Sequence, residues 1–214
     1  MKLYTYFRSS AAYRVRIALN LKGLAYDAVP VHLLRGGGEQ RQAAYRAVNP
    51  AALVPALVDG DCTLTQSLAI IEYLEETHPF MPLLPQDAAG RARVRALALT
   101  VAADTHPLTN LRVLQHLTGA MGLAEEVKMD WYRHWLREGM AVLEAHLARD
   151  GDTGRFCHGD TPTIADCCLV PQVFNAQRFE VDLAPYPTVA RIHAACADIP
   201  AFQAAHPSAQ PDAE

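Results

Sequence analysis

The order of strand and helix signals is the feature that most constrains the fold of this chain. Over the first eighty residues, short runs typical of strands alternate with segments whose apolar positions recur at helical spacing. Strand, helix and strand in that order indicate a βαβ unit, and Asp59-Gly60 between two apolar runs indicates a hairpin turn. The expected strands are Lys2–Tyr6, Tyr26–Leu33, Val54–Val58 and Cys62–Leu64, and the expected helices are Ala11–Lys22, a short one ending near Ala47, and Gln66–His78.

Beyond residue 80 the pattern is helical almost throughout. Pro79, Pro82 and Pro85 fall within seven positions, too many for a helix or a central strand. We therefore expect an α/β domain at residues 1–80, a linker at residues 81–90 and an all-helical domain at residues 91–214. The expected helices after the linker are Ala88–Thr118, Leu123–Arg149, Thr163–Phe179, Thr188–Ala197 and Pro200–Ala205, followed by a polar segment, Pro207–Glu214, that we expect to be loose.

Two local patterns refine this prediction. Pro107 lies inside the long helix predicted first, where it is expected to introduce a kink. Thr163 and Asp166 are spaced like a capping box, with Thr163 as the N-cap and Asp166 bonding back to its main chain. We interpret the capping box as structural.

Composition argues against several classes of function. With 214 residues, of which 50% are hydrophobic, the chain is long enough to bury a substantial core. A formal net charge of −4 argues against nucleic acid as the main partner. The amino terminus has no charged-then-apolar signal pattern, and no apolar run approaches the roughly 18 residues of a membrane helix. We expect a cytoplasmic protein that binds neither nucleic acid nor membrane.

The cysteines and histidines give little support to redox or metal chemistry. The five cysteines show no Cys-x-x-Cys spacing, and their odd number leaves at least one outside any intramolecular disulfide. We expect them to be reduced, which disfavours a dithiol oxidoreductase. The nine histidines form no His-Glu-x-x-His pair, so no metal site is predicted.

Two serines and an arginine occupy the turn where the first predicted strand leads into the first helix. Arg8, Ser9 and Ser10 stand in this turn, and the helix amino terminus presents unpaired N–H groups and the positive end of its dipole. A thiol held there, with an ordinary pKa of about 8.5, would ionise more easily. Ser9 or Ser10 could instead serve only as a helix cap, and the two roles are compatible.

Several motifs together resemble one family. They are the window Tyr6-Phe7-Arg8-Ser9-Ser10-Ala11-Ala12-Tyr13-Arg14-Val15-Arg16, the segment Asn49-Pro50-Ala51-Ala52-Leu53-Val54-Pro55, the segment from Gln66-Ser67 to Glu75-Glu76, and Ala165-Asp166-Cys167-Cys168-Leu169-Val170-Pro171-Gln172. Over nearly the whole chain the sequence resembles the zeta class of glutathione transferases. This resemblance implies a thioredoxin-like α/β domain at residues 1–80, followed by the all-α helical domain of the glutathione transferase fold.

The resemblance also implies roles for particular residues toward glutathione. Ser9 and Ser10 would stabilise its thiolate, and the main chain of Val54, before a cis-Pro55, would pair with its cysteinyl part. Gln66 and Ser67 would hold the γ-glutamyl carboxylate, although capping explains Ser67 equally well. The remaining expected glutathione contacts are Gln40 at the glycine end and His106 and Asn110, four residues apart on one face of the long helix.

Two arginines would bind the substrate. Arg8 and Arg178 would clamp two carboxylates across a cleft, because the planar guanidinium makes bidentate bonds and stays charged. A solvated surface charge is the ordinary alternative for each. His106 would contact substrate or glutathione, or fill the domain interface.

The resemblance implies a homodimeric, glutathione-dependent cis–trans isomerase acting on a small dicarboxylate. Many zeta members carry cysteine directly after the two serines, where this chain has Ala11. That difference favours the maleylpyruvate isomerases of gentisate breakdown, which form fumarylpyruvate by reversible thiolate addition to the double bond. The alternatives are a maleylacetoacetate isomerase, a transferase that conjugates electrophilic halides, and a non-enzymatic carrier with the same fold.

Overall fold

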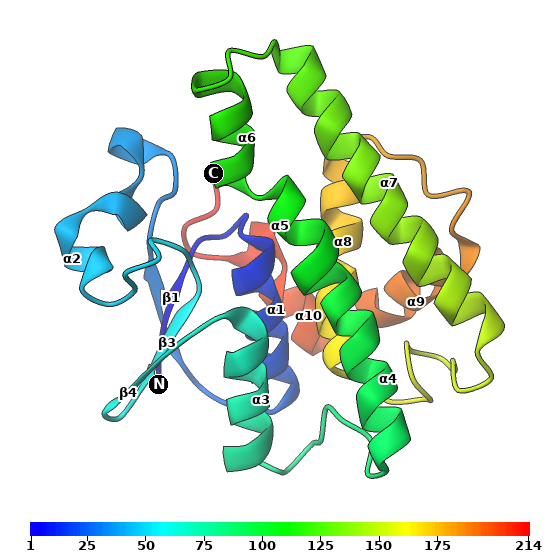
Figure 1. The fold of residues 1–214 in the computed structure, drawn as a ribbon. Coiled ribbons are helices and arrows are strands. Elements are labelled where there is room, and N and C mark those ends of the chain that lie inside the picture. The colour runs from blue at the N-terminus through cyan, green and yellow to red at the C-terminus, as the bar shows by residue number, and fades with distance from the viewer. The chain divides into compact units, whose positions relative to one another are not determined.

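Figure 1 shows the computed structural model, which describes all 214 residues. The chain divides into two compact units. The first unit comprises Met1–Leu83 together with Ala197–Glu214, and the second comprises Leu84–Cys196. The division after Leu83 falls inside the predicted linker, but residues 197–214 group with the first unit, whereas we expected them in the helical domain.

A four-stranded sheet forms the centre of the first unit. Its strands are β1 (Lys2–Thr5), β2 (Asp27–Pro30), β3 (Ala56–Asp59) and β4 (Cys62–Thr65), in the spatial order β2-β1-β3-β4. β1 runs parallel to β2 and antiparallel to β3, so that Leu3 pairs with Ala28 on one side and Leu57 on the other. β3 and β4 form the predicted hairpin.

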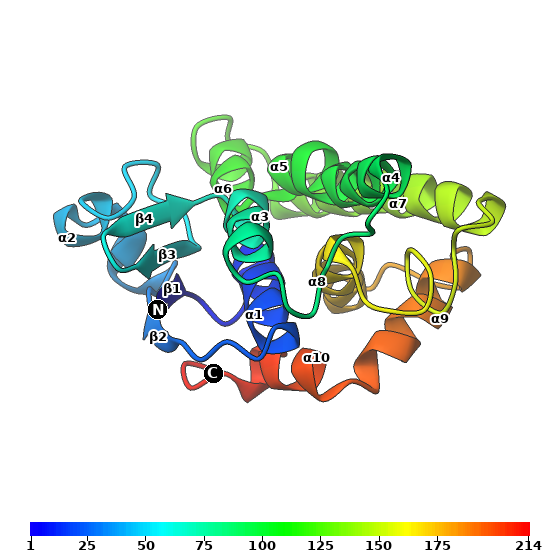
Figure 2. The same ribbon diagram turned by 90° about the horizontal axis from the view of Figure 1, so that it is seen from below.

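Helices cover both faces of this sheet. α1 (Ser10–Leu21) and α3 (Ser67–Thr77) lie side by side on one face, and α2 (Ala43–Arg46) lies on the other (Figures 1 and 2). An apolar cluster fills the space on the α2 side and consists of Tyr6, Phe7, Val31, Tyr45 and Val54. The predicted βαβ and ββα units are therefore present.

α1 is largely buried. It packs between α3 and α10 (Pro200–Ala205), as Figure 2 shows from below, and its residues 12–19 are all buried. Two of these residues are arginines: Arg14 is 2% exposed and Arg16 is 0% exposed. A buried charge is costly unless it is paired and hydrogen-bonded, so both side chains need internal partners.

The expectation of a loose carboxyl-terminal segment is wrong. Pro207–Ala209 forms a 3₁₀ turn, and the side chain of Gln210 donates hydrogen bonds to the carbonyls of Ala204 and His206, both at 2.9 Å. Asp212 accepts a hydrogen bond from the N–H of Phe7. These bonds to α10 and to the first strand's end hold a segment that its polar composition alone suggested was mobile.

The second unit is all helical. Its helices are α4 (Ala88–Leu99), α5 (His106–Thr109), α6 (Leu111–Gly119), α7 (Glu125–Arg149), α8 (Ile164–Arg178) and α9 (Pro187–Ala197), with a π-helical segment, Thr100–Thr105, between α4 and α5. α8 packs against α4. Gly139 of α7 allows a close crossing, because a Cβ there would overlap the side chain of Thr105.

The long helix predicted over Ala88–Thr118 is interrupted. After the π-helical segment, Asn110 adopts extended backbone angles (φ −65°, ψ 144°), and its side chain accepts a hydrogen bond from the N–H of Arg112 as the N-cap of α6. Pro107 lacks the N–H that a continuous helix would use, and asparagine favours caps over helix interiors. Both effects explain why the apolar periodicity overstated the helix.

The predicted capping box at the start of α8 is confirmed. The carboxylate of Asp166 accepts hydrogen bonds from the N–H of Thr163 at 2.7 Å and from its hydroxyl at 2.9 Å. It also accepts one from the N–H of Cys157 at 2.9 Å. Burial raises the pKa of Asp166, and these bonds act in the opposite direction.

Two further features of the whole chain bear on the sequence analysis. All five cysteines are free thiols. None of the helices combines the length and the apolar composition that a membrane span requires.

A buried ion pair joins the end of α1 to α3. The ammonium group of Lys22 lies 2.7 Å from the carboxylate of Glu75, and their side chains are 0% and 9% exposed. Lys22 also donates to the carbonyl of His78 at 2.9 Å, and Glu75 accepts from the N–H of Leu83. The pair therefore holds the chain that leaves the first unit after α3.

Removing one partner should leave the other charge buried without compensation. We predict that Glu75→Ala lowers the free energy of unfolding by about 3 kcal/mol, measured by chemical denaturation with circular dichroism. Glu76→Ala, one position further along the same helix and exposed, should change it by less than about 0.5 kcal/mol. Equal effects of the two substitutions would show that the pair adds nothing.

Candidate functional site

The amino end of α1 contains Ser9 and Ser10, the two serines predicted to stabilise a thiolate. Ser9 is its N-cap, and the Ser9 hydroxyl oxygen accepts a hydrogen bond from the N–H of Ala12 at 3.2 Å. A serine hydroxyl has one proton to donate, which this bond does not use. No acidic residue lies in the first turn, so the positive end of the helix dipole is not neutralised there. Ser10 begins the helix and is 9% exposed.

The buried guanidinium of Arg16 fixes the turn before this helix. It donates to the hydroxyl of Thr5 at 3.0 Å and to the carbonyls of Tyr6 at 3.3 Å and Phe7 at 3.0 Å. Its Nε donates to the carbonyl of Ala205, in α10, at 3.1 Å. Four acceptors thus converge on one planar donor, and three of them belong to the chain that ends β1 and leads to Ser9.

The amino end of α3 lies against α1. Arg14 of α1 donates from Nη1 to the hydroxyl oxygen of Ser67, the first residue of α3, at 3.2 Å. Because Arg14 can only donate, the proton of this serine remains available to another acceptor. Gln66 precedes the helix in the left-handed region, with φ of 70°. The first unit therefore brings together two helix amino ends that each present a serine.

The remaining predicted residues of the first unit occupy its other loops. The peptide bond between Val54 and Pro55 is cis, as predicted. Val54 stands before β3, whose ladder with β1 begins at Ala56, so its main chain takes no part in that ladder. Gln40 is 5% exposed; its amide nitrogen donates to the carbonyl of Leu33, and its buried Oε1 accepts no hydrogen bond.

The two arginines predicted to bind carboxylates share one arrangement. The guanidinium of Arg8 lies over the ring of Phe7, 4.7 Å from its centroid, and that of Arg178 lies over the ring of Phe179 at 4.9 Å. Neither guanidinium donates a hydrogen bond or forms an ion pair within the protein. Stacking fixes the plane of each fork and leaves its edges free to bind a planar anion.

Arg178 has further aromatic surroundings in the second unit. The rings of Phe179 and Tyr132 lie with centroids 4.0 Å apart. Burial raises the pKa of the Tyr132 hydroxyl, and the charge of Arg178 partly opposes this shift. Arg178 is thus close to a buried phenol while remaining exposed itself at the end of α8.

The structure separates His106 from Asn110. We predicted that the two would share a face of one helix, but His106 begins α5 and Asn110 lies outside it as the cap of α6. The spacing of four residues therefore does not align them. The Asn110 side chain is engaged with the N–H of Arg112, at 3.1 Å.

The predicted residues divide between the two units. Those in the first unit are Arg8, Ser9, Ser10, Gln40, Val54, Pro55, Gln66 and Ser67, and those in the second are His106, Asn110 and Arg178. No group of three or more histidine, cysteine or acidic side chains is arranged to hold a metal ion.

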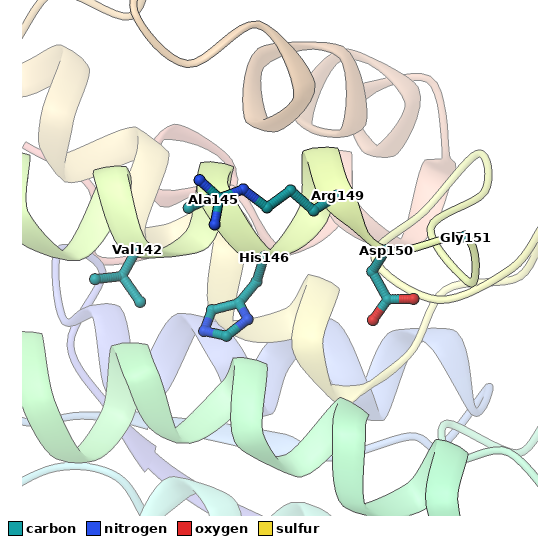
Figure 3. Close-up of a pocket in the computed structure, with 6 residues that line it drawn as sticks. All are labelled: Val142, Ala145, His146, Arg149, Asp150 and Gly151. Carbon is teal, nitrogen blue, oxygen red and sulfur yellow. The ribbon is translucent and has the colours of Figure 1, made fainter.

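A hollow elsewhere in the second unit contains none of these residues. It lies at the carboxyl end of α7, and Figure 3 shows the side chains of Val142, His146 and Asp150 on one side of that helix. All six lining residues are exposed, and Asp150 is paired with Arg93 at 2.5 Å. This open hollow encloses too little to hold a substrate away from water.

Comparison with known proteins decides the family. The model of the glutathione S-transferase N-terminal domain matches residues 3–86, and that of the C-terminal domain matches residues 131–209. A probable maleylacetoacetate isomerase of Vibrio cholerae is 53% identical over 211 residues, which are 99% of this chain and 97% of that protein. A solved maleylpyruvate isomerase, described as a bacterial zeta-class glutathione S-transferase, is 50% identical, covers 100% of both chains and has a TM-score of 0.97. The chain belongs to the zeta class of the glutathione S-transferase family.

Another solved relative has glutathione bound. The maleylacetoacetate isomerase of Anaeromyxobacter dehalogenans, solved with glutathione bound in its active site, is 50% identical to this chain. The match covers 100% of this chain and 97% of that one, with a TM-score of 0.88. The predicted family and the predicted glutathione transferase fold are confirmed.

The sequence did not lead us to expect the contacts that Arg16 and Asp212 make with the turn before α1. A usable signal was present: the first helix is apolar around Arg14 and Arg16, and charges in such a helix must be buried with partners. No comparable signal marked Asp212, because a proline-containing polar segment at the end of a chain is ordinarily mobile.

Proposed function

We propose that this protein is a glutathione-dependent cis–trans isomerase that converts maleylpyruvate to fumarylpyruvate in gentisate breakdown. The observation that carries the proposal is that each of the two predicted carboxylate-binding arginines, Arg8 and Arg178, stacks on an aromatic ring and forms no hydrogen bond or ion pair within the protein. Two such groups suit a substrate with two carboxylates better than a neutral electrophile. The likeness to a solved maleylpyruvate isomerase, with a TM-score of 0.97, supports a substrate of this class.

The residues of the first unit fit glutathione. The free hydroxyl protons of Ser9 and Ser67 and two helix amino ends are donors for its sulfur and its γ-glutamyl carboxylate. The main chain of Val54, outside the ladder of β3, suits the peptide of the cysteinyl part, and the unpaired Oε1 of Gln40 suits an N–H donor near the glycine end. Binding of glutathione to the relative from Anaeromyxobacter dehalogenans supports this assignment.

The mechanism follows from what the chain's own residues do. When bound, glutathione supplies a thiolate that adds to the double bond, making it single and free to rotate, and then leaves unchanged. Ser9, with Ser10 and the dipole of α1, would hold this sulfur in its ionised form. Arg8 and Arg178 would fix the two carboxylates and stabilise negative charge that develops on the neighbouring carbonyl oxygen. His106 remains a proposed contact for glutathione or substrate, and Asn110 for glutathione.

Three other functions stay open to test. A maleylacetoacetate isomerase would use the same residues, and the relative from Vibrio cholerae carries that name. A transferase for electrophilic halides would need the thiolate site but not two carboxylate-binding arginines. A non-enzymatic carrier is least favoured, since a scaffold needs neither an exposed helix amino end nor arginines that form no hydrogen bond or ion pair.

We further propose a cytoplasmic homodimer. Glutathione transferases are generally dimeric, and the first unit exposes Phe80 and Met81, which are 84% and 66% exposed. Large apolar side chains side by side on a surface suit burial against another chain. Sedimentation velocity would distinguish a dimer from a monomer.

The decisive test of function is turnover with a small amount of glutathione. With glutathione at about one hundredth of the substrate concentration, we predict that maleylpyruvate is consumed completely, because an isomerase regenerates the thiol. Maleylacetoacetate, measured in parallel, should be converted with a lower kcat/KM. Consumption that stops when glutathione is exhausted would identify a conjugating transferase, and no consumption of either diacid would favour the carrier.

The thiolate site has its own test. Ser9→Ala should raise the pKa of bound glutathione's thiol by about one unit or more, since the hydroxyl donor is lost. Ser9→Thr keeps both the hydroxyl and the helix cap and should retain the wild-type value. Ultraviolet titration of the thiolate measures each pKa, with Ser10→Ala alongside to compare the two serines. An unchanged pKa in all three variants would remove both serines from this role.

A further inference from the structure

Both peptide groups of Phe7 are held by charged side chains. Its carbonyl accepts a hydrogen bond from Arg16 at 3.0 Å, and its N–H donates to Oδ2 of Asp212 at 3.0 Å. The N–H of Ser9 donates to the carbonyl of Tyr6 at 2.9 Å, which closes a turn with Phe7 and Arg8 at its centre. The two charges therefore fix the plane of the chain immediately before Arg8 and Ser9.

Asp212 makes this contact from the other end of the chain. The hydrogen bond joins residues 205 positions apart, and it is the only one that the carboxylate forms. The other oxygen, Oδ1, is buried and has no hydrogen-bond partner. The Asp212 carboxylate thus forms no hydrogen bond within its own segment. Its single hydrogen bond goes to Phe7, so its role is to hold Phe7 and not to stabilise the segment.

The segment is anchored on both sides of Asp212. Before it, Gln210 is 8% exposed and bonds to two carbonyls at the end of α10. After it, Glu214 lies 2.9 Å from the guanidinium of Arg35 and 3.2 Å from the ring nitrogen of His32. The contact with His32 lowers the pKa of Glu214 most, and the charge of Arg35 acts in the same direction. These contacts set the position from which the carboxylate reaches Phe7.

Asp212 and Arg16 also compensate each other electrically. Burial lowers the pKa of Arg16 to about 10, while Tyr26, Tyr13 and Asp212 act in the opposite direction. The aspartate thus supplies negative charge near a guanidinium that is fully removed from water. The two opposite charges therefore bond to the two peptide groups of the same residue, Phe7.

We propose that Asp212 is a positioning residue for the thiolate site: by holding the N–H of Phe7 opposite Arg16, it sets the turn that presents Ser9 and Arg8. The inference rests on the proposed binding of glutathione at the start of α1. The segment that carries Asp212 would then support the glutathione site through the main chain of Phe7. Truncation of the segment at residue 211 is expected to impair that site for the same reason.

The test separates position from charge. Asp212→Asn keeps an acceptor for the N–H of Phe7 and loses the charge, whereas Asp212→Ala loses both. We expect Asp212→Ala to raise the pKa of bound glutathione's thiol by about one unit, and Asp212→Asn to leave it within about 0.3 units of wild type. Asp198→Ala, an exposed aspartate of the same unit, is the matched control and should change nothing.

A second probe distinguishes positioning from general damage. S-methylglutathione has no ionisable thiol, so Asp212→Ala should lower the affinity for it by less than about twofold. The same substitution should lower the affinity for glutathione by about tenfold at neutral pH. Isothermal titration calorimetry measures both affinities. An equal loss of affinity for the two ligands would mean that Asp212 has a structural role alone, and it would overturn the inference.

Other outcomes are equally decisive. If Asp212→Ala does not fold, Asp212→Glu keeps the charge and changes only the reach of the carboxylate; a raised thiol pKa supports positioning, and a wild-type value overturns it. A wild-type protein that leaves glutathione's thiol at its solution pKa would overturn the proposed function and this inference with it. A normal wild-type shift that Asp212→Ala preserves would overturn this inference alone.

Discussion

The first unit depends on one fully buried guanidinium. Arg16 is 0% exposed, and its donors meet the hydroxyl of Thr5 and the carbonyls of Tyr6, Phe7 and Ala205. Each hydrogen bond to a charged group contributes about 1.5–3 kcal/mol, which offsets the cost of removing the charge from water. The same bonds fix the chain between β1 and α1, so stability of the fold and geometry of the turn have a common cause.

This constraint explains how a small turn can serve chemistry. A helix amino end attracts anions wherever it is exposed, but its effect on a thiol depends on where the donors point. Here the hydrogen bonds of Arg16 and Asp212 to the main chain of Phe7 fix the turn. Ser9 caps the helix and keeps a proton to donate. Arg8 follows Phe7 directly and stacks on its ring, so its fork is oriented by the same residue that the buried charges hold.

The sequence predicted most of the architecture because local signals agreed with the fold. Helical periodicity, the Asp59-Gly60 turn and the proline-rich linker each depend on nearby residues. The strands and α-helices of the first unit overlap the predicted segments, although β3 begins at Ala56 and not at Val54. The capping box of Thr163 and Asp166 is also local. The interruption at Asn110 was missed because periodicity sums over many residues, whereas a single cap decides where a helix stops and restarts.

The site was harder to predict because its supports are distant in sequence. Ser9 and Ser67 were predicted from their positions at helix amino ends and from the resemblance, and Val54 from the resemblance and its place before Pro55. Their roles toward glutathione remain proposals. The contact of Asp212 with Phe7 spans 205 positions. No pattern in a single sequence reports such a pairing, since nothing local requires an aspartate near the end of the chain.

The glutathione affinity of Arg16→Lys tests the central claim most directly. Lysine keeps the positive charge but has one nitrogen, which cannot reach all four acceptors of the planar guanidinium. If Arg16 arranges the turn through these bonds, the dissociation constant of glutathione measured by calorimetry should rise by about tenfold or more, in a variant whose circular dichroism still shows a folded chain. A folded Arg16→Lys protein that binds glutathione as tightly as the wild type would contradict the account.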